Sequence, residues 1–262
     1  MTHLDKSKLA ALLCSLAILV ALTACGSGET ERQGKSVALT VSAAASLTDA
    51  LQEAADVFHE EHPDIEVDFN FGGSGALQQQ ISQGAPADMF FSASQSDFDA
   101  LLENGSIAEE QSVNLLQNEL VLVTPSDNQT VTSFDNIQEA SQIAVGTPES
   151  VPAGKYSMQT FDSLGMTADV EPLLVYAEDV RAVLTYVERG EIDAGLVYRT
   201  DALTSDSVEI ADAAPEGAHD PIVYPVGLIK ESDNTEAAEI FYKFLQAEDA
   251  LAVFEKYGFT VE

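Results

Sequence analysis

Hydrophobic residues along this chain follow two spacings in turn, one typical of strands and one typical of helices. Ile65, Val67, Phe69 and Phe71 alternate with polar residues as in a half-buried strand, whereas the apolar positions between 47 and 58 recur at helical spacing. Strands are predicted at 37–41, 65–71, 88–93, 120–123, 143–146, 170–176, 194–198 and 222–229. Helices are predicted at 47–58, around 77–81, from 98, after 152, and at 178–189, 236–245 and 247–257. Strands that alternate with helices predict an α/β fold with parallel sheets and crossover connections.

The first 24 residues have the features of an export signal rather than of a folded element. Lys6 and Lys8 precede an apolar run at 9–24, which is shorter than the roughly 20 residues that a membrane-spanning helix needs. A Leu-Thr-Ala-Cys sequence ends this run at Cys25, and the segment resembles a bacterial lipoprotein signal. We expect cleavage before Cys25, a lipid on that cysteine and a flexible tether at 25–36, with an uncleaved membrane anchor as the alternative. The mature protein would be exported and either lipid-anchored to the outer face of the cell membrane or periplasmic.

The charge of the chain excludes one class of partner. Asp and Glu number 44 against 11 Lys and Arg, which gives a formal net charge of −33 at pH 7. No basic surface can be assembled from this composition, so nucleic-acid binding is not expected. A hydrophobic share of 45% is that of an ordinary globular protein, and 262 residues suit one large domain or two small ones. With Cys14 in the signal and Cys25 lipidated, no cysteine remains for a disulfide, a metal site or a nucleophile.

Small residues stand where several predicted helices follow strands. Ser46, Ser74, Ala153 and Val180 occupy such junctions, where backbone N–H groups lack a helical partner and the helix dipole is positive. In an open α/β sheet these junctions gather at the carboxyl edge of the strands, where ligands bind. Several helix starts that converge on one point would bind an anion. Each junction also has a purely structural interpretation: Ser46 as a helix N-cap, the glycines around Ser74 as a turn, and Pro152 as a helix start.

Two other kinds of site can be built from the same chain. The Gly-x-Ser-x-Ala sequence centred on Ser74 approaches the nucleophile elbow of α/β hydrolases, which makes Ser74 a candidate nucleophile of a serine hydrolase. Such a triad needs a downstream acid and histidine, and His219 is the one histidine that follows Ser74. His59 and His62 could share a helix face as metal ligands, but they do not form the His-Glu-x-x-His motif. We interpret this pair as a solvated helix end and expect no cation site.

Seven short motifs follow one another in a fixed order. They read AAASLT at 43–48, FGGSGAL at 71–77, GAPADMFFSA at 84–93, VPAGKY at 151–156, AEDVR at 177–181, GLVY at 195–198 and KYGF at 256–259. In this order they resemble the molybdate-binding proteins of bacterial ABC importers, and the resemblance runs from about Val37 to the C-terminus. An ordered set of this kind is far more specific than any one of its members.

The resemblance implies an architecture and a function. The fold would be a two-lobed class II periplasmic-binding-protein fold, in which each lobe is a mostly parallel sheet flanked by helices. Lobe 1 would comprise 37–118 and 221–262, and lobe 2 would comprise 119–220. The protein would be a monomer and not an enzyme, would need no cofactor, and would hold molybdate in the cleft between the lobes. It would deliver the anion to an ABC permease and its ATPase.

The ligand contacts that the resemblance implies would come from Ser46 and Ser74 in lobe 1, and from Ala153, Val180 and Tyr198 in lobe 2. All five are neutral donors, through backbone N–H groups, serine hydroxyls or the tyrosine phenol. This set suits molybdate, which at neutral pH is a fully deprotonated tetrahedral dianion that offers only acceptors. Tungstate shares this chemistry as a second ligand, and sulfate is an alternative tetrahedral oxyanion.

A protonated oxyanion such as phosphate also carries a hydroxyl, so it would bind better in a site that contains a carboxylate as an acceptor. Asp179 stands beside Val180, but an acid at a helix start commonly stabilises the helix dipole, which is the role that we expect for it. Gly75 and Ala76 stand where many members of the family carry hydroxyl residues, so one accessory donor is absent. The charge of the whole protein does not exclude an anionic ligand, because exposed charges are screened over about 10 Å at 0.1 M salt.

Overall fold

A computed structural model describes residues 36–128 and 130–262 of the chain. The predicted signal peptide, Cys25 and all but the last residue of the predicted tether lie outside the described residues. Within the two described ranges, no helix is both long and apolar enough to cross a membrane.

The first of two sheets draws its strands from both ends of the described chain. They are Val37–Ala44 (β1), Ile65–Gly72 (β2), Met89–Phe91 (β3), Ile107–Gln117 (β4), Val223–Ile229 (β10) and Thr260–Val261 (β11). In space the order is β11-β4-β10-β3-β1-β2. β1 pairs in parallel with β2 and β3, whereas β10 is antiparallel to β3 and β4, and β11 is antiparallel to β4.

The second sheet is formed by the middle of the chain. Its strands are Leu120–Pro125 (β5), Ile143–Gly146 (β6), Leu174–Ala177 (β7), Ala194–Tyr198 (β8) and Val208–Ala213 (β9). They lie in the order β7-β6-β8-β5-β9. β6 is parallel to β7 and β8, and β5 is antiparallel to β8 and β9.

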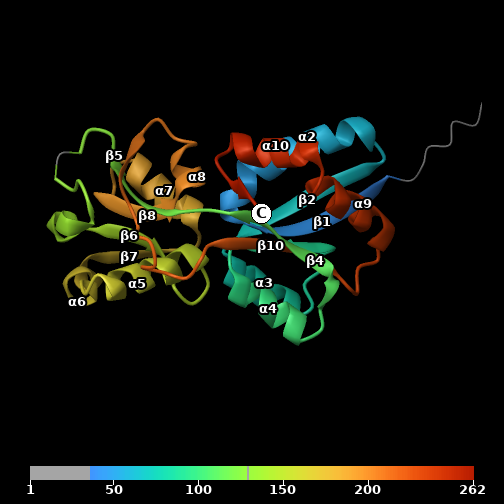
Figure 1. Cartoon of the computed structure of the whole chain (residues 1–262), viewed down its shortest axis with the longest axis horizontal. Coiled ribbons are helices and arrows are strands. Elements are labelled where there is room, and N and C mark those ends of the chain that lie inside the picture. The colour runs from blue at the N-terminus through green and yellow to red at the C-terminus, as the bar shows by residue number, and fades with distance from the viewer. Residues whose placement is uncertain (1–35, 129) are drawn as a thin grey trace, which may run out of the picture. The chain divides into compact units, whose positions relative to one another are not determined.

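Helices cover both faces of each sheet (Figure 1). With the first sheet lie Thr48–Glu61 (α2), Ser74–Ser82 (α3), Gln95–Glu103 (α4), Thr235–Leu245 (α9) and Glu248–Lys256 (α10). With the second lie Pro152–Ser163 (α5), Thr167–Val170 (α6), Val180–Glu188 (α7) and Arg199–Ala202 (α8). The described part of the chain also contains three 3-10 turns, at Ala45–Leu47 (η1), Phe134–Glu139 (η2) and Glu171–Leu173 (η3). We call the first sheet with its helices lobe 1 and the second sheet with its helices lobe 2.

Apolar runs in the sequence become the strands that are buried on both faces. The four residues of β6 and the five residues of β8 are all buried, as expected for strands that helices cover from both sides. The chain passes between the lobes twice, between Gln117 and Leu120 and between Ala213 and Val223. The first link is short and contains only Asn118 and Glu119.

The predicted α/β class with two helix-flanked sheets is confirmed, but the expectation of mostly parallel sheets is wrong in detail. β4 leaves lobe 1 and β10 enters it, so the two strands run in opposite directions and pair antiparallel. β5 and β9 enter and leave lobe 2 and pair in the same way. The sheets are therefore mixed because the chain passes twice between the lobes.

Several segments differ from the sequence-based prediction, among them three strands. Neither β4 nor β9 was expected, because exposed polar residues interrupt the apolar positions of β4, and Glu209 and Asp212 interrupt those of β9. The strand predicted at 170–176 begins only at Leu174, since the residues before it form the end of α6 and the turn η3, which contains Pro172.

Candidate functional site

The five predicted ligand residues line one small cavity between the lobes. Its volume is about 10 Å³, which is the space that about one water molecule needs. The lining residues are Ala44, Ala45, Ser46, Gly72, Gly73, Ser74 and Ala93 from lobe 1, and Val151, Pro152, Ala153, Val180 and Tyr198 from lobe 2. No lining residue carries a charge, so any ligand is held by neutral groups.

Residues at the starts of three helices line the same cavity. Ser74 is the first residue of α3, Val180 is the first residue of α7, and Ala153 follows Pro152 at the start of α5. N–H groups in a first helical turn have no intrahelical acceptor and lie at the positive end of the helix dipole. The three helices therefore bring unpaired donors and partial positive charge to one cavity.

Close backbone packing fixes the position of α5. A side chain on Gly154 would overlap the carbonyl oxygen of Gly146, and one on Gly146 would overlap Val151. Glycine at both positions lets the first turn of α5 lie directly against the end of β6. This contact places the Ala153 N–H at the carboxyl edge of the second sheet.

The two serine hydroxyls are held differently from each other. Ser46 Oγ lies 2.9 Å from the phenol oxygen of Tyr224. Ser74 Oγ accepts a 2.9 Å hydrogen bond from the Ala93 N–H, which leaves the proton of Ser74 available for a ligand. The interpretation of Ser46 as a helix N-cap is wrong: it lies inside η1, and α2 begins after Leu47 without a side-chain cap.

Tyr198 carries a buried hydroxyl for which the described part of the chain offers no partner. The residue is 1% exposed, and within the described residues its phenol oxygen has no hydrogen bond. Burial, more than the nearby phenols and carboxylates, raises the pKa of Tyr198 well above its ordinary value, so the phenol keeps its proton. A buried polar group without a partner is uncommon in a folded protein. This phenol can therefore donate a hydrogen bond to a ligand in the cavity.

Asp179 has the structural role that the sequence favoured. It is the N-cap of α7, and its Oδ1 accepts a hydrogen bond of 2.8 Å from the Ala182 N–H. Asp179 does not line the cavity, so it offers no acceptor to a protonated oxyanion there.

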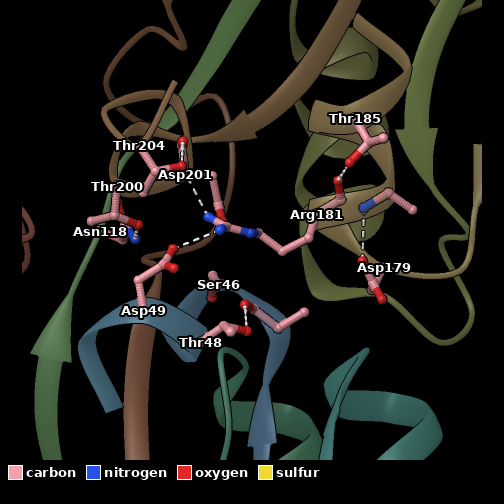
Figure 2. A network of polar contacts seen from close by, with 12 residues as sticks. Ser46, Thr48, Asp49, Asn118, Asp179, Arg181, Thr185, Thr200, Asp201 and Thr204 are labelled. Carbon is pink, nitrogen blue, oxygen red and sulfur yellow. Dashed lines mark hydrogen bonds and ion pairs between the residues drawn. The ribbon is translucent and has the colours of Figure 1, made fainter. Parts of the chain in front are cut away.

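Arg181 connects the lobes beside the cavity (Figure 2). Its guanidinium forms an ion pair with Asp49 of lobe 1, and it contacts Asp201 Oδ1 at 3.5 Å and Thr204 Oγ1 at 3.1 Å in lobe 2. On the other flank, Lys155 Nζ lies 3.0 Å from Ser96 Oγ. These contacts could not be inferred from the sequence, because their partners are brought together only by the fold.

Asp201 makes the stability of the fold depend on pH. Its side chain is fully buried, and burial raises its pKa to about 7 although Arg181 opposes the shift. The folded protein holds the proton of this carboxyl more tightly than the unfolded chain does, because the pKa of an unfolded Asp is only about 4. The group therefore stabilises the fold at low pH, and this contribution is lost as pH rises from about 4 towards 7. Asparagine cannot ionise, so we expect the free energy of unfolding of Asp201→Asn, compared with that of the wild type, to be about 2–3 kcal/mol more favourable to the variant at pH 8 than at pH 5. Urea unfolding of both proteins at the two pH values measures this difference.

The control for this prediction is Asp206→Asn, which removes an exposed carboxylate from the same segment. It should follow the pH dependence of the wild type. If Asp201→Asn also followed the wild type, the ionisation of Asp201 would not contribute to stability.

The alternative sites find no support in the described residues. Ser74 has no hydrogen bond with a histidine there, and His219 instead bonds the carbonyl of Asp220 and lies against the ring of Tyr156. Among the residues that the structure describes, no group of three or more His, Cys, Asp and Glu could hold a metal ion.

Residues 39–260 match the family model described as bacterial extracellular solute-binding protein. This chain belongs to that family. Its relative YvgL of Bacillus subtilis, which is named as a substrate-binding lipoprotein of an ABC transporter, is 47% identical over 95% of this chain and 97% of its own length. The molybdate-binding protein ModA of Haemophilus influenzae is 38% identical over 87% of this chain and 91% of its own length. The chain is thus related to the ModA proteins over nearly its whole length, as the ordered motifs predicted.

A solved structure of a solute-binding protein has the same fold. The periplasmic molybdate-binding protein of Azotobacter vinelandii superposes with a TM-score of 0.78 over 86% of this chain and 99% of its own, at 22% identity. The predicted periplasmic-binding-protein fold is confirmed. Both relatives are named as binding proteins, and one of them as the binding protein of an ABC transporter, so the hydrolase alternative is not favoured.

Proposed function

We propose that this solute-binding protein captures molybdate in the cavity between its lobes and delivers it to an ABC permease. The observation that carries the proposal is the buried phenol of Tyr198, which has no hydrogen-bond partner among the described residues and lines a cavity without charged lining residues. Relatives named as molybdate-binding proteins support the same ligand.

The chemistry of the lining favours a fully deprotonated oxyanion. Donors from Ser46, Ser74, Ala153, Val180 and Tyr198 can each meet an unprotonated oxygen, and hydrogen bonds to a charged acceptor are stronger than those between neutral groups. A protonated oxyanion would place its own hydroxyl against these donors without an acceptor. Tungstate offers the same oxygens as molybdate and is proposed as a second ligand.

The proposal extends to the organisation of the mature protein. Lobe 1 would comprise 37–118 and 221–262, lobe 2 would comprise 119–220, and the lobes would close on the anion. Cys25 would carry the lipid that holds the protein, as a monomer, at the outer face of the membrane, in agreement with the lipoprotein name of YvgL. The charge of −33 then belongs to a solvated surface, while short-range donors determine affinity.

Thermal unfolding in the presence of different oxyanions tests the assignment. A ligand that binds only the folded protein raises its stability by mass action, so molybdate at 100 times its Kd should raise Tm by about 5–10 °C. Tungstate should act similarly, sulfate more weakly and phosphate least. Stabilisation by sulfate or phosphate without any by molybdate would contradict the assignment.

A further inference from the structure

A chain of hydrogen bonds leads from the short link between the lobes to Ser46 in the cavity. Asn118 Nδ2 lies 2.8 Å from Thr200 Oγ1 and 3.2 Å from the phenol oxygen of Tyr224. That oxygen in turn lies 2.9 Å from Ser46 Oγ. Figure 2 shows Asn118 and Thr200 side by side at one edge of the polar network. Tyr224 belongs to lobe 1 and Thr200 to lobe 2, and both are buried.

The orientation of the Asn118 amide determines which group donates in each of these hydrogen bonds. The backbone N–H of Glu119 can only donate, and it donates to Asn118 Oδ1 at 2.9 Å. This bond orients the amide, so Nδ2, which also can only donate, faces the phenol oxygen of Tyr224. Tyr224 therefore accepts from Asn118 and has its single proton left for Ser46 Oγ.

The opposite direction would leave a buried proton without an acceptor. If Ser46 donated to Tyr224, the phenol oxygen would accept twice, and within the described residues no third group lies in hydrogen-bond contact with it. Buried donors without partners are rare in folded proteins. Burial also raises the pKa of Tyr224 well above its ordinary value, so the phenol keeps this proton.

We propose that Asn118 and Tyr224 are positioning residues that aim the proton of Ser46 into the cavity. Because Ser46 Oγ accepts from Tyr224, its own proton is free, and only an acceptor in the cavity can satisfy it. The inference rests on the proposed function and deepens it, since it requires an unprotonated ligand oxygen next to Ser46. Neither positioning residue lines the cavity, so both act through Ser46.

Substitutions at the two positions should alter the Ser46 donor in different ways. Asn118→Asp replaces the donor with an acceptor, so Tyr224 would donate to Asp, accept the proton of Ser46, and leave serine lone pairs facing the anion. Tyr224→Phe removes the phenol without a change in charge. By calorimetry, Ser46→Ala should weaken molybdate binding about 10- to 100-fold and Tyr224→Phe about 2- to 10-fold. Asn118→Asp should weaken it more than Ser46→Ala does.

Double variants distinguish an effect that acts through the Ser46 hydroxyl from a general effect on the fold. In a Ser46→Ala background, Asn118→Asp and Tyr224→Phe should lose most of their effect, because they act through the hydroxyl that is already absent. Asn114→Asp adds the same charge at an exposed position of β4 and should leave affinity within about twofold of the wild type. If Asn118→Asp does not fold, the neutral Tyr224→Phe pair completes the test.

The positioning role and the proposed function are contradicted by different results. Effects of Tyr224→Phe and Asn118→Asp that are undiminished in the Ser46→Ala background would overturn the positioning role while molybdate binding stands. A wild-type protein that gives no heat with molybdate would overturn the proposed function itself, and the positioning role with it.

Discussion

Replacing Gly73 with alanine is expected to weaken molybdate binding about 5- to 150-fold while leaving the ligand-free protein folded. A β-carbon at this position would lie 2.6 Å from the carbonyl oxygen of Ser150 and 3.0 Å from Val151 Cγ2, both in lobe 2. Contacts this close force the lobes apart, and overpacking of this kind costs about 1–3 kcal/mol. Calorimetric titration with molybdate measures the loss.

The neighbouring glycine provides a matched control. A β-carbon on Gly72 would meet only Leu77 of its own lobe, at 3.6 Å, which is an ordinary contact. Gly72→Ala should therefore bind molybdate nearly as the wild type does. Gly73 has φ −66° and ψ 130°, which alanine adopts without strain, so Gly73→Ala should unfold near the wild-type temperature. Equal affinities of the two variants would show that the approach of Gly73 to Ser150 is not required for binding.

The parts of the fold that were predicted from the sequence are those determined locally. β6 and β8 lie at the predicted residues 143–146 and 194–198, because short apolar runs that are buried on both faces have few alternative structures. β9 follows no such local rule. It is the edge strand beside β5 in the second sheet, and Glu209 and Asp212 interrupt its apolar pattern.

The residues of the candidate site also fall into two groups, those that a local sequence rule predicts and those that it does not. Ser74, Ala153 and Val180 were predicted from the simple rule that helix starts after strands offer free N–H groups. Tyr198 came only from the family resemblance, since no local pattern marks a residue at the end of a buried strand as a donor. Tyr224 could not be inferred at all, because its partner Ser46 lies 178 residues away and only the packed sheets bring the two hydroxyls together.

Tyr198→Phe is expected to shift binding and stability in opposite directions. A hydrogen bond to a charged acceptor contributes about 1.5–3 kcal/mol, so loss of the phenol should weaken molybdate binding roughly 10- to 150-fold. The ligand-free protein should become slightly more stable, because the buried hydroxyl has no partner within the described residues and its removal ends an uncompensated desolvation. Calorimetry and thermal unfolding of the ligand-free variant measure the two effects.

The opposite signs distinguish a ligand donor from a packing residue. If Tyr198 served only the core, phenylalanine would fill the same space, and the affinity for molybdate would not change much. Tyr186→Phe is the control in the same lobe, since Tyr186 packs against the core without lining the cavity and should alter neither quantity. Unchanged molybdate affinity in Tyr198→Phe would contradict the role of the phenol. A loss of affinity together with a gain in stability would mean that lobe 2 keeps a destabilising buried hydroxyl because the anion requires it.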